Sequence, residues 1–459
     1  MKTLNIEYII NSVEGELIQG NAGINITGVS IDSRTINPGD LFFAIIGEKK
    51  DGHNYIDKAV ENGAKAVIVD RIVETDANIT VIKVKDTTHA LQELARSYRQ
   101  LLRGLKVVAI TGSAGKTSTK DMIGSLLQVK YKIKKTRGNL NNYYGLPLTI
   151  LEFNGDEEVA VLEMGMSALG EIDLLCRIAK PDIAVITNVG ETHLETLGNI
   201  ENVAKGKSEL IAALADDGIA VLNYDNDYVR AMKKVFKGKQ IVYYGLSPDA
   251  DIYADEIIND SSISIKFSLN YQNENINLKL DRPGRHNVYN ALSAVAVARL
   301  LDLSWQNIKE GFSQVEYSAL RWDVKRTNND ITIINDTYNA NPLSMKAVVE
   351  AICSMQGERI IVTLGAMLEL GSREKDAHLE LGQYLKDKQV DTLITVGEIA
   401  SIIADGAENA GMEKYKIKRV KDNQKALIYL NNYLKPGDIL LVKGSRGNKM
   451  EEIVRNLLN

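Results

Sequence analysis

Cysteine is scarce in this chain: Cys176 and Cys353 are the only two among 459 residues. No Cys-x-x-Cys pair occurs, so the sequence indicates neither a disulfide framework nor a cysteine-based zinc site. No apolar run approaches the ~20 residues that a membrane-spanning helix needs, and the first residues lack the apolar core of a signal peptide. We therefore expect a cytoplasmic protein without membrane insertion.

An excess of positive charge is also missing. The chain has 55 Lys and Arg residues against 60 Asp and Glu, which gives a net charge of −5 at neutral pH. No overall basic field is available to hold nucleic acid or an anionic membrane, so any anion must be bound by a local feature. The length suggests about three domains of ~150 residues each.

The stretch from Lys106 to Thr119 contains the clearest local feature. An apolar run at 107–110 predicts a buried strand, a glycine-rich turn follows, and a helical pattern extends from Lys116 to Leu127. This is the layout of a phosphate cradle, in which Lys116 reaches the outer phosphates and Thr117 can hold Mg²⁺. The spacing is two residues shorter than a Walker A motif, and an ordinary strand-to-helix turn is the alternative. The predicted nucleotide-binding residues are Thr111, Gly112, Ser113, Ala114, Gly115, Lys116, Thr117 and Ser118.

Alternating apolar runs and helical patterns predict an α/β protein of three domains. Residues 1–85 are expected to form a small α/β domain, and a helix at 88–102 leads into the next one. Residues 86–318 are expected to form a central parallel sheet with antiparallel strands added to it. Residues 319–459 are expected to form a second, smaller open α/β sheet.

Two candidate metal ligands lie beyond the carboxyl ends of predicted strands, where open α/β sheets bind their ligands. Glu163 ends one strand and His193 follows another by a short loop, so both are candidates to join Thr117 on Mg²⁺. A turn-capping Glu163 and a structural His193 are the alternatives. Lys207 is placed at the start of a predicted helix, and on its own it would be a solvated lysine.

Polar loops indicate further ligand contacts. The loop that holds Asn139 and Asn141 is suited to binding substrate hydroxyls or amides, although it could equally be a turn cluster. In the last third of the chain, three predicted strands end in polar and basic residues. These strand ends predict a second ligand surface that faces the nucleotide.

Together, these motifs resemble those of the Mur ligases, the ATP-dependent amide-bond synthetases of peptidoglycan precursors. The matching segments are Thr111–Ser118, Gly138–Asn141, Glu163–Gly165, Asn188–Glu195, Gly284–Ala291 and Lys443–Arg446. Within the family, Tyr338–Met345 and Leu364–Gly371 resemble the members that add D-alanyl-D-alanine, as does Asp32-Ser33-Arg34. The Asp-Asn-Pro-Arg motif expected of the member that adds the third peptide residue does not occur.

The resemblance implies that the first domain binds UDP-N-acetylmuramoyl-tripeptide and that the central domain binds ATP and Mg²⁺. A Rossmann-like last domain would close over ATP and bring D-alanyl-D-alanine. Lys116, His193 and Lys207 would be catalytic, with Thr117 and Glu163 on one Mg²⁺ and His193 on a second. Lys207 matches a position that the family carbamylates, which would make it a metal ligand.

The resemblance also assigns the remaining contacts. ATP contacts fall on Asn287, Asn290, Arg321 and Asp336. Substrate contacts fall on Ser33, Arg34, Asn139, Asn141, Tyr338, Asn339, Asn341 and Ser344. We expect a monomer with no nucleic-acid partner.

Two alternatives differ in class. A folylpolyglutamate synthetase shares the chemistry, but the uridine-type motif Asp32-Ser33-Arg34 disfavours it. A nucleotide-dependent switch without catalysis is disfavoured by the amount of ligand-like sequence on all three predicted domains.

Overall fold

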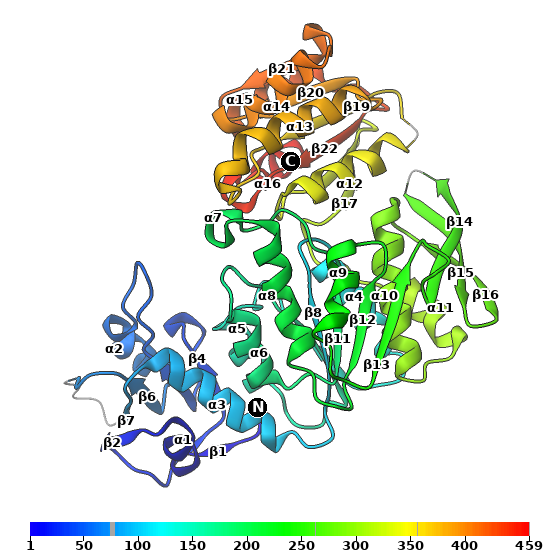
Figure 1. Ribbon diagram of the computed structural model, residues 1–459. Helices are drawn as coiled ribbons and strands as arrows, with labels where there is room; N and C mark the ends of the chain where they lie inside the picture. The colour runs from blue at the N-terminus through cyan, green and yellow to red at the C-terminus, as the bar shows by residue number, and fades with distance from the viewer. Residues whose placement is uncertain (74–78, 262, 356, 459) are drawn as a thin grey trace.

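The computed structural model describes residues 1–73, 79–261, 263–355 and 357–458. These residues form three units, each built around its own sheet, and the chain passes through them in order (Figure 1). The N-terminal unit, in blue, and the C-terminal unit, in yellow, orange and red, lie at opposite ends of the central unit, most of which is green. The predicted α/β class is confirmed.

The N-terminal unit contains a five-stranded sheet of order β2-β7-β6-β5-β4, parallel except for β2. Its strands are β2 (Glu16–Gln19), β4 (Gly28–Ser30), β5 (Asp40–Phe43), β6 (Ala66–Val69) and β7 (Thr80–Lys83), beside a short pair of β1 (Leu4–Asn5) and β3 (Asn25–Ile26). Its helices are α1 (Ile6–Val13) and α2 (Ile56–Glu61). Helix α3 (Thr87–Leu101) confirms the helix expected at 88–102 and begins where the Asp86 side chain accepts two backbone N–H groups. It packs against α1 and against two helices of the central unit, so a continuous apolar core joins the two units.

The central unit is a nine-stranded sheet of order β16-β15-β14-β13-β12-β11-β8-β10-β9. Its strands are β8 (Lys106–Thr111), β9 (Ile133–Lys135), β10 (Val159–Glu163), β11 (Ile183–Ile186), β12 (Ile219–Asn223), β13 (Gln240–Gly245), β14 (Ile252–Ser261), β15 (Ser264–Tyr271) and β16 (Glu274–Leu280). The sheet is parallel from β9 to β14 and antiparallel from β14 to β16, as predicted. Strand order reverses around β8, the position where such sheets bind ligands.

Helices cover both faces of the central sheet, which explains the unbroken apolar strands. They are α4 (Lys116–Leu127), α5 (Gly145–Leu151), α6 (Glu171–Ala179), α7 (Leu194–Leu197), α8 (Ile200–Ala212), α9 (Asp227–Ala231), α10 (Arg285–Leu300) and α11 (Trp305–Ser313). Helices α4 and α10 pack together on one face and share a core with the strands. No helix within the described ranges is long and apolar enough to cross a membrane.

The C-terminal unit is a six-stranded sheet of order β17-β18-β22-β19-β20-β21, with β17 antiparallel to the parallel remainder. Its strands are β17 (Asp323–Arg326), β18 (Thr332–Asp336), β19 (Ile360–Leu364), β20 (Thr392–Val396), β21 (Ile417–Val420) and β22 (Ile439–Lys443). Its helices are α12 (Pro342–Cys353), α13 (Glu374–Lys386), α14 (Glu398–Asn409), α15 (Asn423–Tyr433) and α16 (Glu451–Leu458). Helix α12 starts at Pro342, as predicted, behind a capping box of Asn341 and Ser344.

The start of one helix in the central unit was predicted wrongly. The sequence placed Lys207 at the start of a helix, where on its own it would be a solvated lysine. Helix α8 begins earlier, at Ile200, because the Asn199 side chain accepts the N–H of Asn202 and caps it. Lys207 therefore lies inside the helix and is buried, while Lys205 is exposed.

Candidate active site

The loop between β8 and α4 is the glycine-rich turn for which the sequence predicts a phosphate cradle. Gly115 caps α4 at a φ of 80°, and a Cβ there would lie 2.6 Å from Asn290 Oδ1. At Gly112, a Cβ would lie 1.8 Å from Thr187 Oγ1. A side chain at either position would displace its neighbour, so the loop backbone runs close against Thr187 and Asn290.

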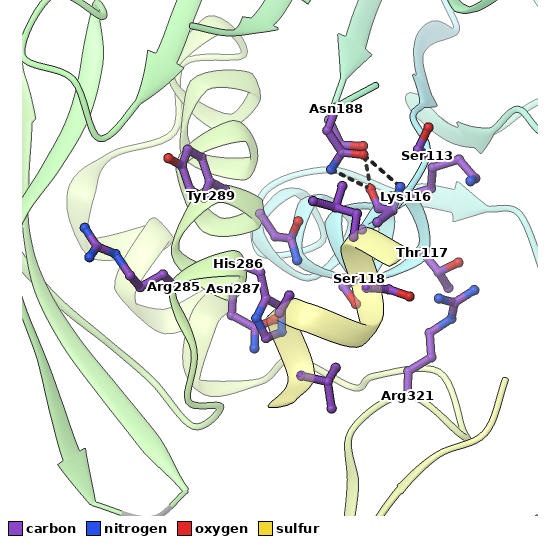
Figure 2. Close-up of a pocket in the computed structure, with 18 of the residues that line it drawn as sticks. Ser113, Lys116, Thr117, Ser118, Asn188, Arg285, His286, Asn287, Tyr289 and Arg321 are labelled. Atoms are coloured by element: carbon purple, nitrogen blue, oxygen red, sulfur yellow. Dashed lines mark hydrogen bonds between the residues drawn. The ribbon is translucent and has the colours of Figure 1, made fainter. Parts of the chain in front are cut away.

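The segment after β11 holds this loop in place. Asn188 Oδ1 accepts the N–H of Ala114 at 2.8 Å, and its amide donates to Ala114 O at 3.1 Å (Figure 2). The Ser113 hydroxyl donates to Gly190 O at 2.9 Å. The loop thus has a fixed shape that two adjacent parallel strands determine together.

Lys116 is the cation of the loop. Its Nζ donates to Gly112 O at 2.7 Å, so the ammonium group lies within the cradle. Burial lowers the pKa of Lys116, an effect that nearby Glu163 opposes and nearby Arg321 reinforces. Lys116 of the central unit and Arg321 of the C-terminal unit thus lie close together, which suits a ligand that is rich in negative charge.

Glu163 ends β10 beside Thr117, as predicted. The Thr117 hydroxyl donates to Glu163 Oε2 at 2.9 Å, and the Asn141 amide donates to Oε1 at 2.9 Å. The carboxylate is almost completely buried, at 3% exposure. A hydroxyl and a carboxylate side by side are the oxygen donors that hard Mg²⁺ prefers, so these residues fit the metal. Asn139, in contrast, is exposed.

A cavity of about 600 Å³ opens between the phosphate loop, the start of α10 and the C-terminal unit. Figure 2 shows Lys116, Thr117 and Ser118 on one side of it and His286, Asn287 and Tyr289 on the other. The predicted residues that line it are Ser113, Ala114, Gly115, Lys116, Thr117, Ser118, Asn287, Asn290, Arg321, Asp336, Tyr338, Asn339, Asn341 and Ser344. Positions from the central and C-terminal units are therefore brought together as the sequence analysis expected.

The C-terminal side of the cavity contains a buried ion pair of Asp336 and Lys443. Burial raises the pKa of Asp336, but Lys443 and the Trp322 N–H outweigh this and hold it below its ordinary value. The Arg321 guanidinium lies 4.0 Å from the centre of the Tyr338 ring. Its buried Nε has no hydrogen-bond partner among the described residues, so Arg321 keeps donor capacity for a ligand.

Other predicted residues lie outside this cavity. His193 Nδ1 is 2.7 Å from Glu369 Oε2 of the C-terminal unit, and this contact lowers the pKa of Glu369. Within the described ranges, no group of three or more His, Cys, Asp or Glu side chains gathers to hold a metal. Ser33 and Arg34 belong to the N-terminal unit. Ser33 is buried there, and the exposed Arg34 pairs with Asp32.

Lys207 is buried near the loop. Burial, with Lys116 close by, lowers the pKa of Lys207 well below its ordinary value. Its amine is therefore biased toward the neutral, nucleophilic form.

Sequence reasoning assigned no role to several residues that line the cavity. Burial lowers the pKa of His286 to about 4, so this imidazole is neutral at physiological pH. Tyr289 donates to Asp225 Oδ2 at 2.8 Å. His286 lies within the Gly284–Ala291 motif, but Asp225 is contributed by a distant turn whose sequence gives no local signal.

Three family models match the chain in order. The Mur ligase family, catalytic domain model matches residues 25–99, the Mur ligase middle domain model matches 110–298, and the Mur ligase, glutamate ligase domain model matches 320–446. Among curated relatives, the UDP-N-acetylmuramoyl-tripeptide--D-alanyl-D-alanine ligase of Bacillus subtilis (strain 168) is 38% identical, over 94% of this chain and 93% of that protein. The protein of the same name from Escherichia coli (strain K12) is 33% identical, over 100% of this chain and 99% of that protein.

Solved structures agree with these matches. A crystal structure of MurF from Acinetobacter baumannii has a TM-score of 0.92 at 32% identity, covering 100% of this chain and 99% of that one. The MurF ligase of Thermotoga maritima in complex with ADP has a TM-score of 0.81 at 31% identity, covering 93% and 96%. A folylpolyglutamate synthase from Mycobacterium tuberculosis, at 17% identity and a TM-score of 0.64, shares the fold alone.

Proposed function

The chain belongs to the Mur ligase family of ATP-dependent ligases, and we propose that it joins D-alanyl-D-alanine to UDP-N-acetylmuramoyl-tripeptide in cytoplasmic peptidoglycan precursor synthesis. The observation behind this proposal is the cavity in which the phosphate loop meets Tyr338, Asn341 and Ser344. Relatives that match nearly the whole chain have the name of this activity. Folylpolyglutamate synthetase remains as a distant second candidate.

We assign the substrates to three stretches of chain. Residues 1–85, which include Ser33 and Arg34, would bind the UDP-linked muropeptide. Residues 86–318 would bind ATP. Residues 319–459 would supply the dipeptide site and close over the nucleotide.

The reaction needs an activated carboxyl group, because the oxygen of a carboxylate is a poor leaving group. A carboxylate oxygen of the tripeptide attacks the γ-phosphorus of ATP, the bond to the bridging oxygen breaks, and ADP leaves. The dipeptide amine then attacks the acyl carbon of this acyl phosphate, loses a proton and displaces phosphate. Lys116 and Arg321 lie where their charges can stabilise the transferring phosphoryl group.

Magnesium would be held by Thr117 and Glu163, which the structure places 2.9 Å apart. Bound there, it would neutralise charge on the phosphate oxygens. The proposed second site needs His193, whose Nδ1 faces Glu369. A carboxylate on Nδ1 would orient the ring, and metal binding would then use Nε2.

Lys207 is proposed to be carbamylated. Its neutral amine would add to the carbon of CO₂ and lose a proton, which converts a would-be cation into a carboxylate-like oxygen ligand. The burial of Lys207 and the lowering of its pKa favour this step. We expect Lys207→Ala to lose most activity and acetate to restore part of it. A carbamate signal in ¹³C NMR spectra with labelled bicarbonate, absent in the variant, would give a direct reading.

A substrate panel tests the main assignment. Phosphate release from ATP is measured with UDP-N-acetylmuramoyl-tripeptide and either D-alanyl-D-alanine, a single L-amino acid or glutamate, and separately with a folate and glutamate. We expect release with the D-dipeptide alone. Activity with a folate and glutamate, and none with the dipeptide, would move the protein to the second candidate.

A further inference from the structure

A lysine is buried beneath the phosphate loop and has no part in the chemistry described above. Lys120 lies on α4 one turn after Lys116, and its side chain is 1% exposed. Fully buried lysines are rare because an ammonium group loses its hydration there, and they require charged or polar partners. The partners of Lys120 therefore indicate what it does.

Both partners are buried carboxylates. Lys120 Nζ lies 3.5 Å from Asp121 Oδ1 and 4.0 Å from Glu163 Oε2. The Glu163 oxygen is the one that accepts the Thr117 hydroxyl. Neither carboxylate is more than 3% exposed, so water screens these charges weakly. Lys120 thus faces one oxygen of the Glu163 carboxylate, and the Asn141 amide donates to the other.

Asp121 connects this cluster to the segment that enters the C-terminal unit. Its Oδ2 accepts the N–H of Ser318 at 2.8 Å. Three residues later comes Arg321, flanked by Leu320 and Trp322 with φ values of 62° and 49°. The left-handed conformation is strained for such residues, so contacts must hold this path.

We propose that Lys120 is a positioning residue of the ligase. Its buried ammonium group holds the Glu163 carboxylate beside Thr117 and the Asp121 carboxylate beneath Ser318 in one fixed arrangement. The orientation of a metal-binding carboxylate and the start of the Arg321 segment are thereby set by the same side chain. This inference rests on the proposed function of Glu163 as a magnesium ligand.

The chain offers a matched control in Lys135. Its Nζ also lies 3.5 Å from Asp121 Oδ1, but its side chain is 35% exposed and its stem passes over Gly124. Between the described residues, the structure gives Lys135 no ion pair with Glu163. Lys120→Met and Lys135→Met each remove one cation from Asp121, and only the first removes it from Glu163.

Two measurements test the role of Lys120. The first is the Mg²⁺ concentration that gives half-maximal phosphate release. The second is amide hydrogen exchange at Ser318 in protein without nucleotide or metal. In Lys120→Met we expect the half-saturating Mg²⁺ concentration to rise about tenfold, the size typical of lost support behind a metal ligand. Exchange at Ser318 should become faster. In Lys135→Met both quantities should stay within about twofold of wild type, as for a partly exposed ion pair.

The direction of the first change is decisive. Removing a cation from beside a metal site would by charge alone lower the Mg²⁺ requirement, whereas loss of positioning raises it. A lower requirement in Lys120→Met, or equal changes in the two lysine variants, would overturn the proposal. A loss of thermal stability with an unchanged Mg²⁺ requirement would do the same.

Asp121→Asn provides the test if Lys120→Met does not fold. The amide keeps an oxygen for Ser318 but removes the charge that faces Lys120. We expect about a threefold rise in the Mg²⁺ requirement, although Asp121 is not itself a proposed ligand. No rise would contradict the proposal.

Glu163→Gln distinguishes failure of the magnesium assignment from failure of the positioning role of Lys120. Wild-type Mg²⁺ dependence in Glu163→Gln would overturn the magnesium assignment itself. A defective Glu163→Gln together with wild-type behaviour of Lys120→Met and Asp121→Asn would overturn only the role of Lys120.

Discussion

Gly115→Ala is the substitution that most directly tests the shape of the phosphate loop. Gly115 has a φ of 80°, and the new Cβ would lie 2.6 Å from Asn290 Oδ1. That oxygen also accepts the Thr119 hydroxyl at 3.2 Å. An alanine therefore meets two costs at once, a left-handed backbone and a displaced amide side chain.

The size of the effect follows from these two costs. The left-handed conformation costs alanine roughly 1–2 kcal/mol, and loss of the hydrogen bond to Asn290 costs about 1 kcal/mol. A total of about 2–3 kcal/mol corresponds to roughly a 30- to 150-fold smaller population of the loop shape that binds phosphate. The apparent affinity for nucleotide falls by the same factor.

Gly124→Ala is the matched control, because Gly124 lies in the same helix. Its Cβ would lie 3.1 Å from Lys135 Cδ, on a side chain that can move, and at an ordinary contact distance of 3.5 Å from Ile133 Cδ1. Replacing a helical glycine by alanine stabilises by roughly 0.5–1 kcal/mol. This variant should therefore bind nucleotide like wild type and melt at the same or a higher temperature.

Calorimetric titration with ADP and the KM for ATP measure both variants. We expect a loss of nucleotide affinity of at least about 30-fold for Gly115→Ala and less than twofold for Gly124→Ala. If Gly115→Ala bound ADP within threefold of wild type, or if both variants lost affinity equally, the proposed geometry of the loop would be refuted.

Three further predictions concern single side chains. Lys116→Ala should abolish phosphate release while far-UV circular dichroism stays unchanged, because Lys116 is the only cation of the loop; wild-type turnover would contradict this. Arg373→Gln removes a 3.1 Å ion pair between the C-terminal unit and Glu191 of the central unit, so X-ray scattering should show a more open molecule. Arg419→Gln is the control, because the ion pairs of Arg419 stay within the C-terminal unit, and its scattering curve should be unchanged. His286 has a folded pKa of about 4 against ~6.5 in an unfolded chain, so it destabilises the fold progressively as pH falls from about 6.5 to 4, by up to about 3 kcal/mol. The free energy of unfolding measured in urea should therefore fall more between pH 7 and pH 5 for wild type than for His286→Gln. An equal fall in the two proteins would contradict this.

The central sheet was predictable from sequence because helices cover both of its faces. Strand β10 is buried throughout and β8 is buried after its first residue, Lys106, so both appear as apolar runs. The edge strands β17 and β21 of the C-terminal unit were missed for the converse reason. Their sequences, Asp-Val-Lys-Arg and Ile-Lys-Arg-Val, are polar and largely exposed, and only pairing with a neighbour makes them strands.

The pairing of Thr117 with Glu163 was predictable from topology, since both follow the ends of parallel strands at one edge of the sheet. The burial of Lys207 could not be predicted in this way. Its local sequence resembles a solvated lysine pair, and only the cap at Asn199 and the packing of α8 place it inside. The ion cluster of Lys120 could not be predicted from the sequence either, because Ser318 lies 197 residues from Asp121.

Asn341 shows why residue roles are harder to predict than residue positions. The sequence marks it as a substrate contact, and the structure does place it in the cavity. Its Oδ1, however, accepts the Ser344 N–H at 2.8 Å and starts α12, while its Nδ2 donates to Ser113 O at 3.3 Å and touches the phosphate loop. Both ends of one amide are thus engaged, one within the C-terminal unit and one across to the central unit. A movement of α12 away from the loop must break the second bond, so the position of the C-terminal unit and the contacts of the phosphate loop are linked through this side chain.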